Sequence, residues 1–174
     1  MIIWINGAFG SGKSTVAREL GRTLDDSFLF DPENMGFYLR ENLPKELKQD
    51  DFQDISLWRD LNFEMLSYMA NHYNGKIIVP MTLVNPHYFE RIVPRLQKEG
   101  VPVLHFSLVA SKETLLKRLE SRGDSEDSWP ARQIDRCIEG LSHEKFKEFI
   151  DTDDLSIEDM AQTILESIKV QSRN

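Results

Sequence analysis

The sequence is poor in cysteine: Cys137 is the only one among 174 residues, so no disulfide can form within the chain. A chain of this length without disulfides is typical of a reducing compartment, and we expect a cytoplasmic location. Long apolar runs are missing too. No stretch approaches the roughly 20 apolar residues of a membrane-spanning helix. The first apolar run begins at Ile2, without the charged segment that opens a signal peptide. Membrane association is therefore expected to be weak or absent.

Positive charge is also scarce. The 21 Lys and Arg residues are outnumbered by 29 Asp and Glu residues, which gives a formal net charge of −8. Because nucleic acids are bound through basic surfaces, this balance argues against a nucleic-acid partner and leaves a small-molecule partner open. With 40% hydrophobic residues, the chain suits a single domain over residues 1–174, as a monomer or a homodimer.

One motif stands out against these absences: residues 7–14 match the P-loop pattern G-x-x-x-x-G-K-[ST]. An apolar run precedes the motif and a helix-forming segment follows it, which is the strand–loop–helix context that the motif requires. The glycines bring backbone N–H groups close to phosphate oxygens, and the helix N-terminus adds partial positive charge. We expect Lys13 to reach the β- and γ-phosphates of ATP and Ser14 to hold Mg²⁺. The expected nucleotide contacts in this loop are Gly7, Ala8, Phe9, Gly10, Ser11, Gly12, Lys13, Ser14 and Thr15.

Two other signatures of P-loop proteins are missing. Large ATPases carry an acidic pair after an apolar strand beside the P-loop, whereas the third apolar run here ends in Pro80-Met81-Thr82. The N-K-x-D and D-x-x-G motifs of GTP-binding switches do not occur in a fitting context. These absences favour small P-loop kinases, in which the acidic group comes from elsewhere.

Strand and helix signals alternate along the rest of the chain. The apolar run at 2–5 predicts the first strand, and four more are expected at 27–31, 76–81, 101–109 and 149–151. Helical patterns are expected at 13–24, 33–42, 52–73, 86–99 (kinked at Pro94), 112–122, 130–140 and 157–170. This alternation predicts a three-layer α/β fold of the P-loop kinase-like type: a five-stranded parallel sheet with helices on both faces and a short helical lid at about 118–136. Ligands of such sheets bind at the carboxyl ends of the strands.

Asp31 is the best candidate for the missing acidic group. It ends the second apolar run, which we interpret as a short buried strand, and so is expected on the same rim as Lys13. A carboxylate there can orient an acceptor hydroxyl, take its proton or bind Mg²⁺ through water. The alternative is that Asp31 caps the helix opened by Pro32, and one residue can do both.

Arginines are expected to complete the site. Arg118 and Arg122 lie four apart on one predicted helix, where like charges repel unless an anion such as phosphate lies between them; a solvated basic face is the alternative. Arg132 and Arg136 have the same spacing, but acidic residues on the same helix offer them partners. A contact with the acceptor and a plain surface position are therefore equally supported. The candidates for the wall of the acceptor pocket are Arg40, Arg59 and Thr82. The candidates for the adenine site are Asp151 and Thr152.

Five stretches of the chain resemble the bacterial tunicamycin-resistance P-loop proteins: Met1–Lys13, Asp31–Phe37, Val79–Thr82, Ala110–Leu119 and Gln133–Leu141. More widely, the layout is similar to that of adenylate, shikimate and chloramphenicol kinases. The resemblance implies an ATP-binding protein that protects a bacterial cell from tunicamycin, a nucleoside antibiotic. It also implies that Arg118 and Arg122 contact adenine and phosphate, and that Asp31 matches the acidic residue that follows the second strand in the shikimate and chloramphenicol types.

Three functions fit these features. The first is transfer of the ATP γ-phosphate to a hydroxyl of a small nucleoside- or sugar-containing acceptor, with tunicamycin as one candidate. In the second, ATP binding closes the lid and the antibiotic is sequestered without chemistry. The third, a nucleotide-driven switch with a protein partner, has the least support in the sequence.

Overall fold

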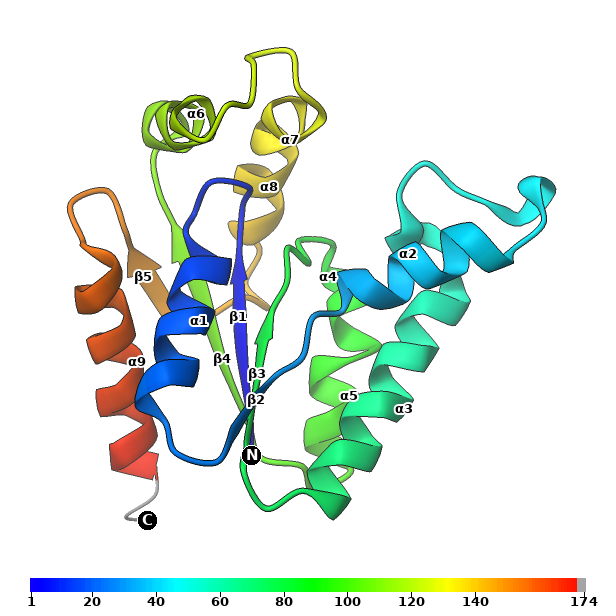
Figure 1. Ribbon diagram of the computed structural model, residues 1–174, viewed down its shortest axis with the longest axis vertical. Helices are drawn as coiled ribbons and strands as arrows, with labels where there is room; N and C mark the ends of the chain where they lie inside the picture. Colours follow the sequence, from blue (N-terminus) through cyan, green and yellow to red (C-terminus); the bar gives the residue numbers. More distant parts are fainter. Residues whose placement is uncertain (172–174) are drawn as a thin grey trace.

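The computed structural model describes residues 1–171, which fold around a five-stranded parallel sheet (Figure 1). The strands lie in the order β2-β3-β1-β4-β5. Their bounds are β1 Ile2–Gly7, β2 Ser27–Leu29, β3 Lys76–Pro80, β4 Val103–Val109 and β5 Phe149–Asp151. Every pair of neighbours is parallel, with Ile3 of β1 opposite Ile78 of β3 and Leu104 of β4. The predicted P-loop kinase-like sheet is confirmed.

Helices cover both faces of this sheet (Figure 1). Among residues 1–171 the α-helices are α1 Lys13–Thr23, α2 Glu33–Asn42, α3 Ser56–His72, α4 Pro86–Glu90, α5 Val93–Lys98, α6 Lys112–Ser121, α7 Trp129–Arg132, α8 Ile134–Leu141 and α9 Ile157–Gln171. Two short 3₁₀ turns, Lys45–Leu47 and Phe52–Asp54, lie between α2 and α3. Within the same range no helix is long and apolar enough to cross a membrane.

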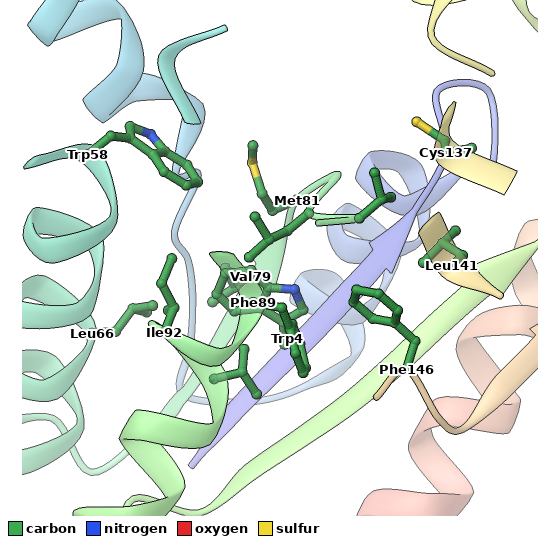
Figure 2. Close-up of a cluster of buried hydrophobic side chains, with 14 of the residues drawn as sticks. Trp4, Trp58, Leu66, Val79, Met81, Phe89, Ile92, Cys137, Leu141 and Phe146 are labelled. Atoms are coloured by element: carbon green, nitrogen blue, oxygen red, sulfur yellow. The ribbon is translucent and has the colours of Figure 1, made fainter. Parts of the chain in front are cut away.

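The alternation of side chains in β1 divides the interior into two cores. Ile3 and Ile5 face α1 and α9, whereas Ile2 and Trp4 face the side of α3, α4 and α5. Figure 2 shows part of the second core, where Trp4 lies near Phe89. Because helices bury both faces, β1 has no polar alternation, as is usual in parallel sheets.

Three predicted helices are interrupted or shortened. The helix expected at 130–140 is two short helices, α7 and α8, with Gln133 between them. The segment expected to be one kinked helix at 86–99 is two helices, α4 and α5, with the break at Arg91–Ile92 and Pro94 in the first turn of α5. Proline lacks an N–H and crowds the carbonyl four residues earlier, so a helix through Pro94 is broken rather than bent. The helix expected from 52 starts only at Ser56, because the Asp51 side chain accepts from the Gln53 N–H at 3.0 Å and holds a 3₁₀ turn instead.

The interpretation of 27–31 as a buried strand is wrong. The strand is only Ser27–Leu29, it pairs with β3 alone, and Phe28 and Leu29 are 50% and 42% exposed. An edge strand buries less than a central one, and the apolar run did not reveal which position it would take. Asp31 therefore lies in the loop two residues beyond β2, not at its last position.

Glycine 36 lets α2 pack closely on the Phe52 turn. A Cβ at this position would lie 2.5 Å from the Phe52 ring. We expect Gly36→Ala to lower the free energy of unfolding by about 1–3 kcal/mol, as overpacking does, although alanine is the better helix former. Urea unfolding measures the change.

Gly21→Ala is the matched control, since Gly21 is also inside a helix but its added Cβ would meet only Ile78 at 3.9 Å. This variant should gain up to about 1 kcal/mol from helix propensity. Equal changes in the two variants would contradict the packing argument.

Candidate active site

The P-loop joins β1 to α1 through two glycines in the left-handed backbone region. Gly10 has φ +83° and Gly12, which precedes α1, has φ +91°. A Cβ at Gly10 would lie 2.7 Å from the Leu115 carbonyl oxygen, so the backbone also passes too close to α6 for any side chain. The loop therefore presents bare backbone at the N-terminus of α1, the arrangement that binds phosphate in P-loops.

Two buried side chains fix the start of this loop. Asn6 accepts from the N–H groups of Gly7 and Leu83, each at 2.9 Å, and donates to the Leu83 carbonyl at 2.8 Å. The Thr82 hydroxyl donates to the Gly7 carbonyl at 2.8 Å. Together they tie the end of β1 to the segment that follows β3, so the phosphate loop has a rigid base.

These hydrogen bonds change the role that was predicted for Thr82. Thr82 was expected in the acceptor pocket, but it is 1% exposed and its hydroxyl serves the P-loop. Its carbonyl also accepts from the buried Gln53 side chain at 2.7 Å. No role in the site was predicted for Asn6. The available sequence signal was a lone amide at the end of an apolar run, directly before the first glycine of the motif.

Lys13 is buried and folds back over its own loop. Its Nζ donates to the Ala8 carbonyl at 3.3 Å and lies 5.2 Å from the centre of the Phe9 ring. Burial lowers the pKa of Lys13 to about 8, and the nearby Glu33 charge opposes this shift. A buried cation with one long hydrogen bond is suited to receive an anion.

Three hydroxyl side chains, those of Ser11, Ser14 and Thr15, flank this lysine in the sequence. Ser14 and Thr15, in the first turn of α1, are exposed and so accessible to a metal ion or phosphate. The Ser11 hydroxyl is buried, and its oxygen has no hydrogen-bond partner among the described residues. An orphaned buried hydroxyl and a cradle that a Cβ would fill both fit a phosphate-binding loop.

Two carboxylates lie across the rim from Lys13. Asp31 Oδ1 accepts from the Glu33 N–H at 2.9 Å, so the side chain of Asp31 satisfies the first N–H of α2, although the N-cap position itself is Pro32. Glu33 is partly buried; burial and then the Asp31 charge raise its pKa, while Lys13 and Arg122 act in the opposite direction. Sequence reasoning missed Glu33, because an acidic residue in the first turn of a helix is common and carries no signal by itself.

The two lid arginines do not share a partner. Arg118 donates to the Thr152 hydroxyl at 3.0 Å and to the Thr152 carbonyl. Arg122 follows the last residue of α6, with φ −98° and ψ 6°, and forms an ion pair with Asp124 at 2.5 Å. The i, i+4 rule holds only inside a helix, and α6 ends at Ser121, one residue short of the predicted end.

The segment expected to form a lid, residues 118–136, contacts the P-loop directly. Trp129 of α7 packs edge-on against Phe9, with ring centres 5.2 Å apart. Cys137 of α8 is buried beside the same loop, where burial raises the pKa of its thiol and the Phe9 backbone N–H opposes that shift. Arg132 donates to the Asp127 carbonyl inside the lid. The cysteine thus has a packing role next to the phosphate loop.

Three arginines predicted for the acceptor side converge on residues 50–53. Arg40 donates to the Asp50 carbonyl at 2.7 Å, Arg59 donates to the Gln53 carbonyl, and Arg136 pairs with the Asp51 carboxylate at 3.3 Å. Arg59 also lies 4.2 Å above the Tyr88 ring. The structure brings these side chains to one segment, where each is bonded to the protein.

Comparison with known proteins places this site in a family. Residues 2–143 match a family model described as an AAA domain, and the solved structures that match share the P-loop kinase-like fold. The chain belongs to this family. No match is found among curated proteins.

Among solved structures, the tunicamycin resistance protein of Deinococcus radiodurans is 32% identical, with a TM-score of 0.82 over 96% of this chain and 94% of that chain. The resemblance inferred from sequence is confirmed. A gluconokinase from Sinorhizobium meliloti 1021 has 15% identity and a TM-score of 0.68, covering 99% of this chain and 93% of that one. A thymidylate kinase from Candida albicans has 18% identity and a TM-score of 0.64, covering 98% and 92%. At these low identities the two kinases show the fold alone.

Asn6 offers a direct test of the rigid base. Asn6→Ala leaves three buried backbone groups without partners, so we expect the free energy of unfolding to fall by at least about 2 kcal/mol. Asn71→Ala is the control, because Asn71 also donates to a carbonyl, that of Ser67, but is exposed. Urea unfolding of both variants measures the difference, and similar losses would contradict a special role for Asn6.

Proposed function

We propose that this protein transfers the γ-phosphate of ATP to a hydroxyl of a small nucleoside- or sugar-containing acceptor, with tunicamycin as one candidate. The observation that carries the proposal is a buried lysine in a phosphate loop, facing the carboxylate pair Asp31 and Glu33. Kinase chemistry needs such an arrangement, because it depends on holding phosphate and acceptor together and on neutralising charge.

The proposed roles follow from position. The P-loop N–H groups and Lys13 hold the β- and γ-phosphates, and Ser14 binds Mg²⁺, which would offset phosphate charge. Asp31 Oδ1 is bonded to the Glu33 amide, so we assign its Oδ2 to the acceptor hydroxyl, whose proton it accepts. We assign Arg118 and residues 151–152 to the adenine ring. Arg122 is assigned, with Lys13, to the negative charges of the phosphates.

Sequestration without transfer is the second candidate, and one observation favours it. Asp31 already satisfies the first N–H of α2, and that structural role alone explains its presence. Tunicamycin resistance in the related Deinococcus protein fits either function. The two candidates differ in whether the Asp31 charge is needed.

Asp31→Asn separates them, because asparagine caps a helix as well as aspartate does but is a poor base. We expect MgATP affinity to stay within about twofold and phosphate transfer to fall by about 10²–10⁴-fold, the usual effect of a lost general base. Mass spectrometry of tunicamycin and of uridine after incubation with protein and MgATP detects transfer. If the parent adds no phosphate and resistance survives in the variant, sequestration is the better account.

The pH dependence of nucleotide binding tests Lys13. The pKa of Lys13 is about 8 in the free protein, so the lysine is charged below that pH and loses its proton above it. A bound triphosphate stabilises the charged form; hence MgATP affinity should be constant below pH 8 and fall by up to about tenfold per pH unit above it.

Lys13→Arg provides the control for this experiment. Arginine stays protonated throughout the range, so the variant should lose the fall above pH 8 whatever its absolute affinity. Calorimetric titrations between pH 7 and 10 measure both proteins. The same decline in parent and variant would assign the pH dependence to another group.

A further inference from the structure

Gln53 is a buried polar side chain in the 3₁₀ turn Phe52–Asp54, just before α3. Only 7% of the residue is exposed, and its side-chain amide donates to the Thr82 carbonyl at 2.7 Å. A carbonyl can only accept, so the NH₂ group is the part of the amide that faces Thr82. A buried hydrogen bond contributes little net stability, because the same groups bond to water in the unfolded chain. The main consequence of this bond is therefore the position that it gives to Thr82.

The Thr82–Leu83 peptide, which Gln53 holds, is part of the base of the phosphate loop. Its carbonyl accepts from Gln53, and its N–H, which belongs to Leu83, donates to the Asn6 side chain at 2.9 Å. Asn6 also accepts from the Gly7 N–H, and the Thr82 hydroxyl donates to the Gly7 carbonyl at 2.8 Å. The peptide is thus fixed at both ends and connected to the first residue of the P-loop motif. Asn6 holds one end from β1, whereas Gln53 holds the other from outside the sheet.

The turn that carries Gln53 is itself held by neighbouring helices. Arg59 of α3 donates to the Gln53 carbonyl, and the Gln53 N–H donates to the Asp51 carboxylate at 3.0 Å. Asp51 also pairs with Arg136 of α8 at 3.3 Å. Both backbone groups of Gln53 are therefore bonded, so its side chain starts from a fixed point. Through this turn, helices α3 and α8 are connected to the base of the phosphate loop.

We propose that Gln53 is a positioning residue for the phosphate loop: it transmits the fixed position of the turn to the Thr82–Leu83 peptide, and so keeps the loop ordered before nucleotide binds. A loop that is already ordered binds phosphate more tightly, because no order has to be imposed on binding. The proposal deepens the proposed function, on which it rests only where MgATP binding is measured. Gln53 acts through Thr82 and is not assigned a contact with nucleotide or acceptor.

Gln53→Leu tests this role by removing the amide while keeping a side chain of similar size. We expect MgATP affinity, measured by calorimetry at pH 7.5, to fall by at least about threefold. Gln97→Leu is the matched control, because the Gln97 amide also donates to a carbonyl, that of Val103 at 3.3 Å, but is exposed on α5. The control should stay within about 1.5-fold of the parent. Parent-like affinity in Gln53→Leu would overturn the proposal, because the bond would then serve packing alone.

Gln53→Glu separates the hydrogen bond from packing. Burial raises the pKa of the introduced carboxyl well above its ordinary value of about 4.3. Its protonated form donates to the Thr82 carbonyl as the amide does, whereas its carboxylate repels that carbonyl. Relative to the parent at the same pH, we expect MgATP affinity within about twofold at pH 5 and at least about threefold lower at pH 8. A ratio that stays constant with pH would contradict the proposal. This comparison uses one protein, so it also decides the matter if Gln53→Leu does not fold.

The ratio to the parent removes the effect of groups that titrate in both proteins. The charged and titratable groups bonded around the turn are Asp51 and Asp54 at the turn itself, Arg40 on α2, Arg59 on α3, Tyr88 on α4 and Arg136 on α8. None of them is replaced in Gln53→Glu. A ratio that changes with pH is therefore assigned to the introduced carboxyl.

A double-mutant cycle tests the route through Thr82. Thr82→Val removes the hydroxyl that holds Gly7, so it should weaken MgATP binding as well. If Gln53 acts through Thr82, adding Gln53→Leu to Thr82→Val should weaken binding by less than about a further 1.5-fold. Losses that multiply would show that Gln53 acts by another route, and the assignment would fail.

Hydrogen exchange of the free protein gives a readout that needs no ligand. The backbone amides of residues 7–14 should exchange at least about threefold faster in Gln53→Leu than in the parent, whereas those of residues 103–109 should not. Equal exchange in the loop of both proteins would refute the positioning role. If the parent does not bind MgATP, the proposed function fails, and hydrogen exchange still decides the role of Gln53. If MgATP binds but no phosphate is transferred, the binding tests of Gln53 are unaffected.

Discussion

The hydrogen bonds of Asn6 and Thr82 are the constraint on which the site depends. A phosphate loop works only if its N–H groups already point at the ligand, since ordering them on binding would reduce affinity. Here the loop leaves β1 with both backbone groups of Gly7 held: its N–H donates to the buried Asn6 amide oxygen, and its carbonyl accepts from the buried Thr82 hydroxyl. Asn6 belongs to β1 and Thr82 follows the end of β3, and these two strands pair in parallel, so the register of the sheet sets the geometry of the loop.

The electrostatics of the site build on this rigid base. Lys13 is buried and makes one long hydrogen bond, to the Ala8 carbonyl. The negative charges of Asp31 and Glu33 partly balance its positive charge from a distance. A carboxylate in direct contact with Lys13 would satisfy the lysine permanently and compete with phosphate. Because Asp31 lies in the loop before α2 and Glu33 in the first turn of α2, the charge of Lys13 is partly balanced while the position next to Nζ is left for an anion.

The sequence was sufficient for the fold and the phosphate loop because both depend on local patterns. Glycine spacing, Lys13 and alternating strand and helix signals are all read within a few residues. Asn6, Glu33 and the role of Thr82 were not predicted, since each depends on a partner in another element; the Thr82 hydroxyl donates to the Gly7 carbonyl across 75 positions of sequence. Glu33 became visible only when α2 placed it near Lys13, and β2 could not be identified as an edge strand without its neighbours.

The arginines show why spacing alone misleads about function. Arg118 and Arg122 have the right separation for one helix face, but α6 ends between them and each finds its own partner. Arg40, Arg59 and Arg136 come from three helices and meet at one short acidic segment. An arginine that must give up a bond to the protein in order to reach an anionic ligand gains less from binding that ligand. These three arginines therefore hold residues 50–53 in place.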